Sequence, residues 1–174
     1  MKSITRRSSS LSLLKLLLLL VAVPAIASAA EMPAWLVLNP SDSPETLMST
    51  DVLEKNSLVR GGWRVSGMGL LHTEGGADTG LLHRMVHPLP NGAVLRMLVA
   101  TADDVNAQLK AGYVTEGALG YVALKPGPGH IAVYRFTKEN KFIWLISGAD
   151  QAWATKNGWT REQAVFWLWV DNNR

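Results

Sequence analysis

Two glutamates and two arginines recur at matching places in the chain, and their types suit acid–base chemistry. Glu116 and Glu162 each lie four residues after a glycine, and Arg84 and Arg135 lie in apolar runs upstream of them. Two carboxylates in different environments can hydrolyse a glycosidic bond. A glutamate beside an arginine of a neighbouring strand more often forms a structural ion pair. We therefore expect a repeated buried ion pair at these positions and no catalytic residue.

Nucleophiles and metal ligands are poorly represented. The chain has no cysteine, which excludes thiol catalysis and disulfides, and it has no Gly-x-Ser-x-Gly element. His83 and His87 lie four apart in a strand-like run, which separates them by about 13 Å, too far to share a metal. His72 and Glu74 have no third ligand type nearby. We expect no metal site and no cofactor.

Tryptophan is abundant, with seven residues in 174. Exposed aromatic faces can stack on the rings of sugars, whereas core packing is the ordinary use of an aromatic side chain. Trp167 and Trp169 share one face of the last apolar run. We expect three aromatic residues at equivalent positions in the core: Trp63, Tyr113 and Trp159. The residues considered for ligand binding are Trp144, Trp167, Trp169, Arg84, Arg135, Glu116 and Glu162.

These residues must be positioned by elements that follow a repeat. Glycine–aromatic pairs begin at Gly62, Gly112 and Gly158, about 50 residues apart, as in repeat proteins. Eleven residues before each glycine lies a helix-capping type, followed three positions later by an acid: Asp51 and Glu54, Thr101 and Asp104, Ser147 and Asp150. The pattern predicts helices over 52–61, 102–111 and 148–157, each ending at a glycine in the left-handed conformation.

Apolar runs on both sides of each predicted helix indicate strands. Two runs joined by a turn come before each helix, and a third run follows it. The expected strands are 35–38, 46–48, 63–71, 82–86, 94–100, 113–124, 131–136, 142–146 and 159–170. The sequence thus predicts an α+β fold of three strand–strand–helix–strand units, at about 34–80, 81–130 and 131–174. Because one such unit cannot bury its own apolar faces, we expect the three to pack with pseudo-threefold symmetry into one domain, residues 30–174.

The first 29 residues have the pattern of a secretory signal peptide. Basic residues precede an unbroken apolar run over 16–23, and Ala27, Ser28 and Ala29 form a small-x-small cleavage pattern. The run is too short to span a membrane. Removing this segment leaves 13 basic and 14 acidic residues, which argues against binding to nucleic acid. We expect a periplasmic or extracellular protein, not attached to a membrane after signal cleavage.

The chain resembles a bacterial secreted repeat family of unknown function. Units of that family read Tyr-Arg-apolar, a short turn, His-Phe-Tyr-Thr, a helix, and then Gly-Trp-x-x-Glu-Gly. The matching residues are Val133 to Phe136 with Gly158 to Glu162, His83 and Arg84 with Gly112 to Gly117, and Gly62 to Gly67. The histidine is absent from all three copies, where Thr46, Arg96 and Phe142 take its place. The resemblance implies a non-catalytic module.

We therefore expect an exported binding or accessory module that recognises a glycan, a cell-wall polymer or a secreted partner protein. One alternative is a small exported hydrolase that acts on a polysaccharide, with Glu116 and Glu162 as its carboxylates. A second alternative is a purely structural or inhibitory partner of an enzyme.

Overall fold

In the part of the chain that the structure describes, nine strands and three helices follow one another in the order strand, strand, helix, strand, three times over. The computed structural model describes residues 30–41, 43–90 and 92–171, so the predicted signal peptide lies outside the described residues. The elements are β1 (Glu31–Asn39), β2 (Glu45–Ser49), α1 (Val52–Arg60), β3 (Arg64–His72), β4 (Thr79–Pro88), β5 (Val94–Val99), α2 (Ala102–Lys110), β6 (Val114–Ala123), β7 (His130–Lys138), β8 (Lys141–Leu145), α3 (Gly148–Lys156) and β9 (Thr160–Trp169). The fold is α+β, and each helix lies within one residue of its predicted bounds.

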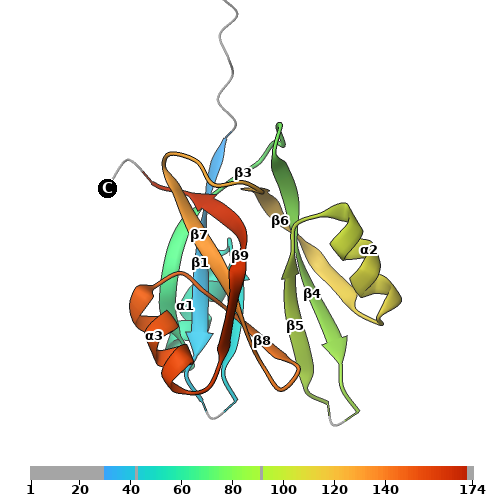
Figure 1. The fold of residues 1–174 in the computed structure, drawn as a ribbon, viewed down its shortest axis with the longest axis vertical. Helices are drawn as coiled ribbons and strands as arrows, with labels where there is room; N and C mark the ends of the chain where they lie inside the picture. The colour runs from blue at the N-terminus through green and yellow to red at the C-terminus, as the bar shows by residue number, and fades with distance from the viewer. Residues whose placement is uncertain (1–29, 42, 91, 172–174) are drawn as a thin grey trace, which may run out of the picture.

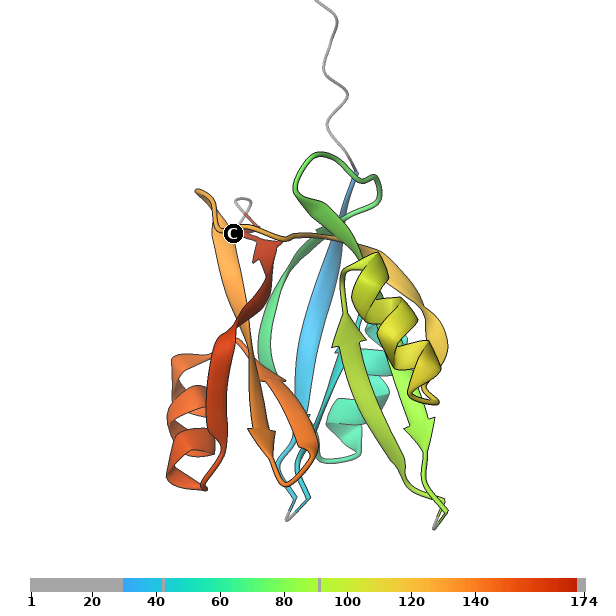
Figure 2. The same cartoon turned by 45° about the vertical axis from the view of Figure 1, so that its right-hand side comes forward.

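The strands form three antiparallel groups, each with the first strand of a unit in the middle. β1 pairs with β2 and β3, β4 pairs with β5 and β6, and β7 pairs with β8 and β9. Single residue pairs then connect β3, β6 and β9 to one another. The three hairpin turns lie at one end of the molecule, and the far ends of β3, β6 and β9 lie at the other (Figures 1 and 2). The three helices lie on different outer sides.

Each helix ends in the same hydrogen-bond pattern, and that pattern explains the glycines. The N–H of Trp63 donates to Leu58 O at 3.1 Å and the N–H of Gly62 donates to Val59 O at 3.1 Å. This is a Schellman motif, and α2 and α3 end in the same way. The φ angles of the three glycines are positive, at 92° for Gly62, 89° for Gly112 and 78° for Gly158. The predicted left-handed conformation is therefore confirmed at all three positions.

The predicted N-caps are formed in two of the three helices. Asp51 Oδ1 accepts from the N–H of Leu53 at 2.7 Å, and Thr101 Oγ1 accepts from the N–H of Asp104 at 3.1 Å. The Ser147 side chain makes no such bond, so the prediction is wrong for the third helix. Asp150 in the first turn of α3 points instead to β3, as described below.

The core lies between the three strand groups. Its largest fully buried side chains include Trp144, Phe136 and Phe166, and α1 and α2 contribute no buried residue. Trp159 is buried, as predicted, but Trp63 and Tyr113 are half-buried. The difference follows from the helices that these aromatic residues cover, since α3 buries Ala154 while α1 and α2 lie on the surface. Among the described residues, no helix combines the length and apolarity needed to cross a membrane.

Candidate functional site

A pocket of about 230 Å³ opens where the three hairpins meet. Its walls come from the β1–β2, β4–β5 and β7–β8 hairpins, and we call it the hairpin-end pocket. Its lining residues are Ser43, Pro44, Glu45, Thr46, Leu89, Ala93, Val94, Leu95, Arg96, Lys141 and Phe142. The described lining residues thus combine an apolar wall with one acidic and two basic side chains.

Three of the lining residues hold the same place in their units. Ser49, Val99 and Leu145 lie opposite Trp35, His83 and Tyr134 in the strand pairing. The residues three positions before them are therefore equivalent, and these are Thr46, Arg96 and Phe142. They are also the positions at which the resembled repeat has its histidine. One equivalent position from each unit thus lines a single pocket.

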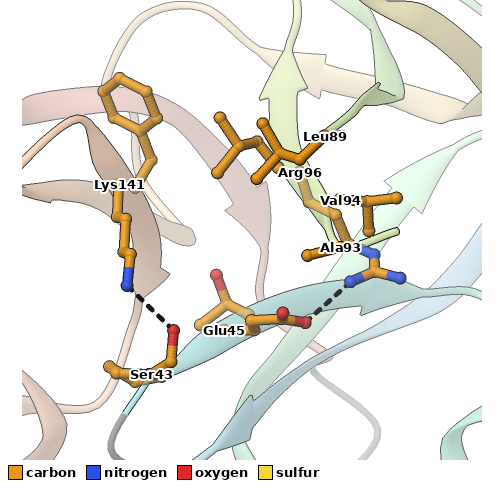
Figure 3. A pocket seen from close by; sticks show the side chains of 11 residues that line it. Ser43, Glu45, Leu89, Ala93, Val94, Arg96 and Lys141 are labelled. Carbon is orange, nitrogen blue, oxygen red and sulfur yellow. Dashed lines mark hydrogen bonds and ion pairs between the residues drawn. The ribbon is translucent and has the colours of Figure 1, made fainter. Parts of the chain in front are cut away.

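Hydrogen bonds and one ion pair order the polar part of the pocket (Figure 3). Arg96 Nη1 donates to Glu45 Oε2 at 2.7 Å, which connects β5 to β2. Lys141 Nζ donates to Ser43 Oγ at 3.0 Å, and Lys141 and Arg96 lie on opposite sides of the pocket. Thr46 is buried and accepts from the backbone N–H of Trp144 at 2.8 Å, which connects β2 to β8. All three hairpins are therefore joined around the pocket.

The predicted pairing of Arg84 with Glu116 is present but only partly buried, since the two side chains are 18% and 31% exposed, and it extends to a third residue. Arg84 Nε lies 2.9 Å from Glu116 Oε2 within the β4–β6 pair. Arg84 Nη1 also donates to both carboxylate oxygens of Glu54 on α1, each at 3.0 Å, and to Met48 O at 3.3 Å. Arg84 therefore joins the second unit to the first.

The predicted pairing of Arg135 with Glu162 is also present. Glu162 Oε2 accepts from Arg135 Nε at 2.8 Å and from Nη2 at 2.6 Å. Arg135 lines a small cavity together with Asp104 and Gln108 of α2, so it faces the second unit. The two glutamates belong to separate ion pairs at different junctions between units.

The junction between the third and first units uses different residues for a similar contact. Ser66 takes the place of Glu116, and its Oγ donates to Asp150 Oδ2 at 2.5 Å. Arg64 forms an ion pair with the same buried carboxylate. In each β-strand pair the register shifts beside Ser66, Glu116 or Glu162, and such a bulge redirects the side chain.

The aromatic candidates lie away from the hairpin-end pocket. Trp167 and Trp169 are half-buried at the opposite end, where they pair with Ala123 of β6 and Leu70 of β3. The Trp169 ring stacks on His72, with centroids 3.7 Å apart and planes 11° apart. Trp144 is 1% exposed, so its ring presents no face to a ligand in this structure.

The residues that line the pocket were not among the candidates from sequence. The histidine position of the resembled repeat, in the second strand of each unit, could have indicated three of them. That these three residues meet in one pocket depends on how three separate hairpins pack, which no single unit specifies. In the described part of the chain, no group of three or more His, Cys, Asp or Glu side chains is arranged to hold a metal ion.

Comparison with known proteins identifies a family and no individual relative. A family model described as a domain of unknown function (DUF5648) matches residues 33–169, which reaches from β1 to the end of β9. No curated protein and no solved structure matches the chain. The chain belongs to the family defined by this domain, DUF5648.

Proposed function

We propose that this chain is an exported, non-catalytic module whose three units close around a pseudo-threefold axis and bind one residue of a glycan or cell-wall polymer in the hairpin-end pocket. The observation that carries the proposal is the convergence of Thr46, Arg96 and Phe142, one equivalent position from each unit, on that pocket. A pocket of about 230 Å³ is smaller than the ~300–1,000 Å³ of drug-sized sites, which suits a single sugar ring.

Contacts between the units support closure around an axis. The second strands β2, β5 and β8 contact one another pairwise, and so do the third strands β3, β6 and β9. Two polar contacts and one shared cavity follow a cycle: Arg84 binds Glu54 on α1 of the first unit, Arg135 lines a cavity with α2 of the second, and Ser66 binds Asp150 on α3 of the third. Each unit thus faces the helix of the unit before it.

The use of the carboxylates favours binding over hydrolysis. A glycosidase needs two carboxyl groups that face one bound sugar, about 5–10 Å apart. Glu116 and Glu162 are each held by an arginine, and they lie at different junctions between units. Among the described residues that line the hairpin-end pocket, the one acid is Glu45, which is paired with Arg96. Export is part of the proposal and rests on the pattern of residues 1–29.

A glycan and peptidoglycan array tests the proposal. The exported protein is compared with an Ala93→Trp variant, which fills the pocket mouth, and with Ala77→Trp, a matched change in an exposed loop at the other end. We expect the wild type and Ala77→Trp to bind the same polymers and Ala93→Trp to lose them. Equal binding by all three proteins would place the site elsewhere, and hydrolysis of an array polymer would overturn the non-catalytic assignment.

A further inference from the structure

The described residues that line the hairpin-end pocket carry two positive charges and one negative charge. Arg96 and Lys141 are basic and Glu45 is acidic, and the Arg96–Glu45 ion pair of 2.7 Å accounts for one charge of each sign. Lys141 Nζ donates to the neutral hydroxyl of Ser43, and no described carboxylate lies within ion-pair distance of it. Within the described residues, Lys141 therefore brings to the rim of the pocket a positive charge that no carboxylate pairs with.

Arg96 is held in place at the pocket. Its Nη1 binds Glu45, and its Nε is buried without a hydrogen-bond partner among the described residues, while the side chain as a whole is 26% exposed. A guanidinium carries five N–H donors in a fixed plane, so an acceptor beside the exposed part of Arg96 meets a charged group whose orientation is already set. Glu45 fixes the orientation of that plane.

From this arrangement we infer that the ligand residue carries a single carboxylate, as a uronic acid does in an acidic polysaccharide. The inference rests on the proposed function. One carboxylate balances the positive charge of Lys141, and the ring of the same sugar can pack on the apolar wall formed by Leu89, Val94, Leu95 and Phe142. Lys141 and Arg96 approach the pocket from opposite sides (Figure 3), and because Arg96 is already paired with Glu45, we expect Lys141 to meet the carboxylate.

Glu45 argues against a more highly charged ligand. A phosphate monoester carries about −1.5 to −2 charges at neutral pH and prefers a free, bidentate arginine. In this pocket Arg96 already binds Glu45, and the Glu45 carboxylate would repel the second charge. The combination of two cations with one anion therefore favours a carboxylate over a phosphate.

The test compares oligogalacturonate with the fully methyl-esterified oligomer of the same length, by calorimetry at low and high salt. We expect the wild type to bind the acid at least about tenfold more tightly than the ester, because a hydrogen bond to a charged group is worth about 1.5–3 kcal/mol. The preference should shrink at high salt. Lys141→Met should reduce acid binding to the level of the ester. Lys125→Met removes the same charge near Asp78 at the other end of the molecule, and it should change neither the binding of the acid nor the binding of the ester.

The outcomes separate this inference from the proposed function. Equal binding of the acid and the ester would show that the pocket does not recognise a carboxylate, while the pocket could still be a glycan site. An acid preference that survives Lys141→Met would also overturn the inference. If neither oligomer binds while a peptide with a free C-terminal carboxylate does, the sugar assignment is wrong. If Ala93→Trp still binds array polymers, the proposed function fails independently.

Discussion

Arg84 on β4 donates two hydrogen bonds of 3.0 Å to Glu54 on α1, thirty positions earlier in the chain. The same guanidinium lies 2.9 Å from Glu116 on its own sheet. A single arginine therefore holds a helix of one unit against the strands of the next. Its side chain is 18% exposed, so water screens these contacts less than those of a surface ion pair.

Replacing this arginine should weaken the contact between units. We expect Arg84→Met to lower the free energy of unfolding by about 2 kcal/mol, between the value of an exposed pair and that of a fully buried one. Urea denaturation measures the change, and Lys125→Met, which breaks an exposed pair with Asp78, should cost less than about 0.5 kcal/mol. Equal losses in both variants would show that Arg84 is an ordinary surface charge.

The glycines at the helix ends should be costly to replace, and not equally so. An alanine in the left-handed conformation costs about 1 kcal/mol relative to glycine. A Cβ at Gly62 meets nothing within 4 Å, but a Cβ at Gly112 lies 3.1 Å from His87 Cε1. Thermal and urea denaturation should show that Gly112→Ala is less stable than Gly62→Ala and Gly158→Ala. Gly148→Ala is the control: Gly148 lies at the start of α3 with open space around it, so the change should be neutral or slightly stabilising. If Gly148→Ala lowered the stability as much as Gly62→Ala, the left-handed conformation would not be the cause of the loss.

The glutamate of the third unit should serve stability and not catalysis. Glu162→Gln keeps the shape of the side chain but replaces the charged acceptor of two bonds from Arg135, so we expect a loss of about 1 kcal/mol. Array binding should stay within about twofold of the wild type, since Glu162 does not line the hairpin-end pocket. A variant that melts like the wild type while an assayed hydrolysis disappears would support the hydrolase instead.

Trp169 provides a test at the opposite end of the molecule. Because His72 covers one face of its ring, we expect Trp169→Ala to destabilise the protein by about 2 kcal/mol, below the ~3–5 kcal/mol of a fully buried tryptophan. Polymer binding by the folded variant should be unchanged. If binding is lost while the melting curve is preserved, the aromatic surface is the ligand site.

Sequence signals that act over a few residues predicted the helices, but they did not predict the contacts between units. Caps and glycines placed the helices within one residue because these signals act within a few positions of the chain. The pairs Arg84–Glu116 and Arg135–Glu162 were predictable because their strands are neighbours within a unit. The partners Glu54 and Asp150 lie in other units, and their contacts depend on how whole sheets pack.

Trp144 and Phe142 show the same limit within one strand. Alternation places both on the same face of β8, but Phe142 lines the pocket while Trp144 is buried in the core. The depth of each residue below the pocket mouth is set by the other two hairpins. No pattern in the third unit alone carries that information.

An NMR titration tests most directly whether the hairpin-end pocket is the binding site. The backbone amide resonances are followed while the polymer that binds most tightly on the array is added. We predict that the largest shifts fall on residues 43–46, 93–96 and 141–142, in all three hairpins at once. Shifts confined to the opposite end, around Trp167 and Trp169, or to a single hairpin would contradict a site built from three converging units.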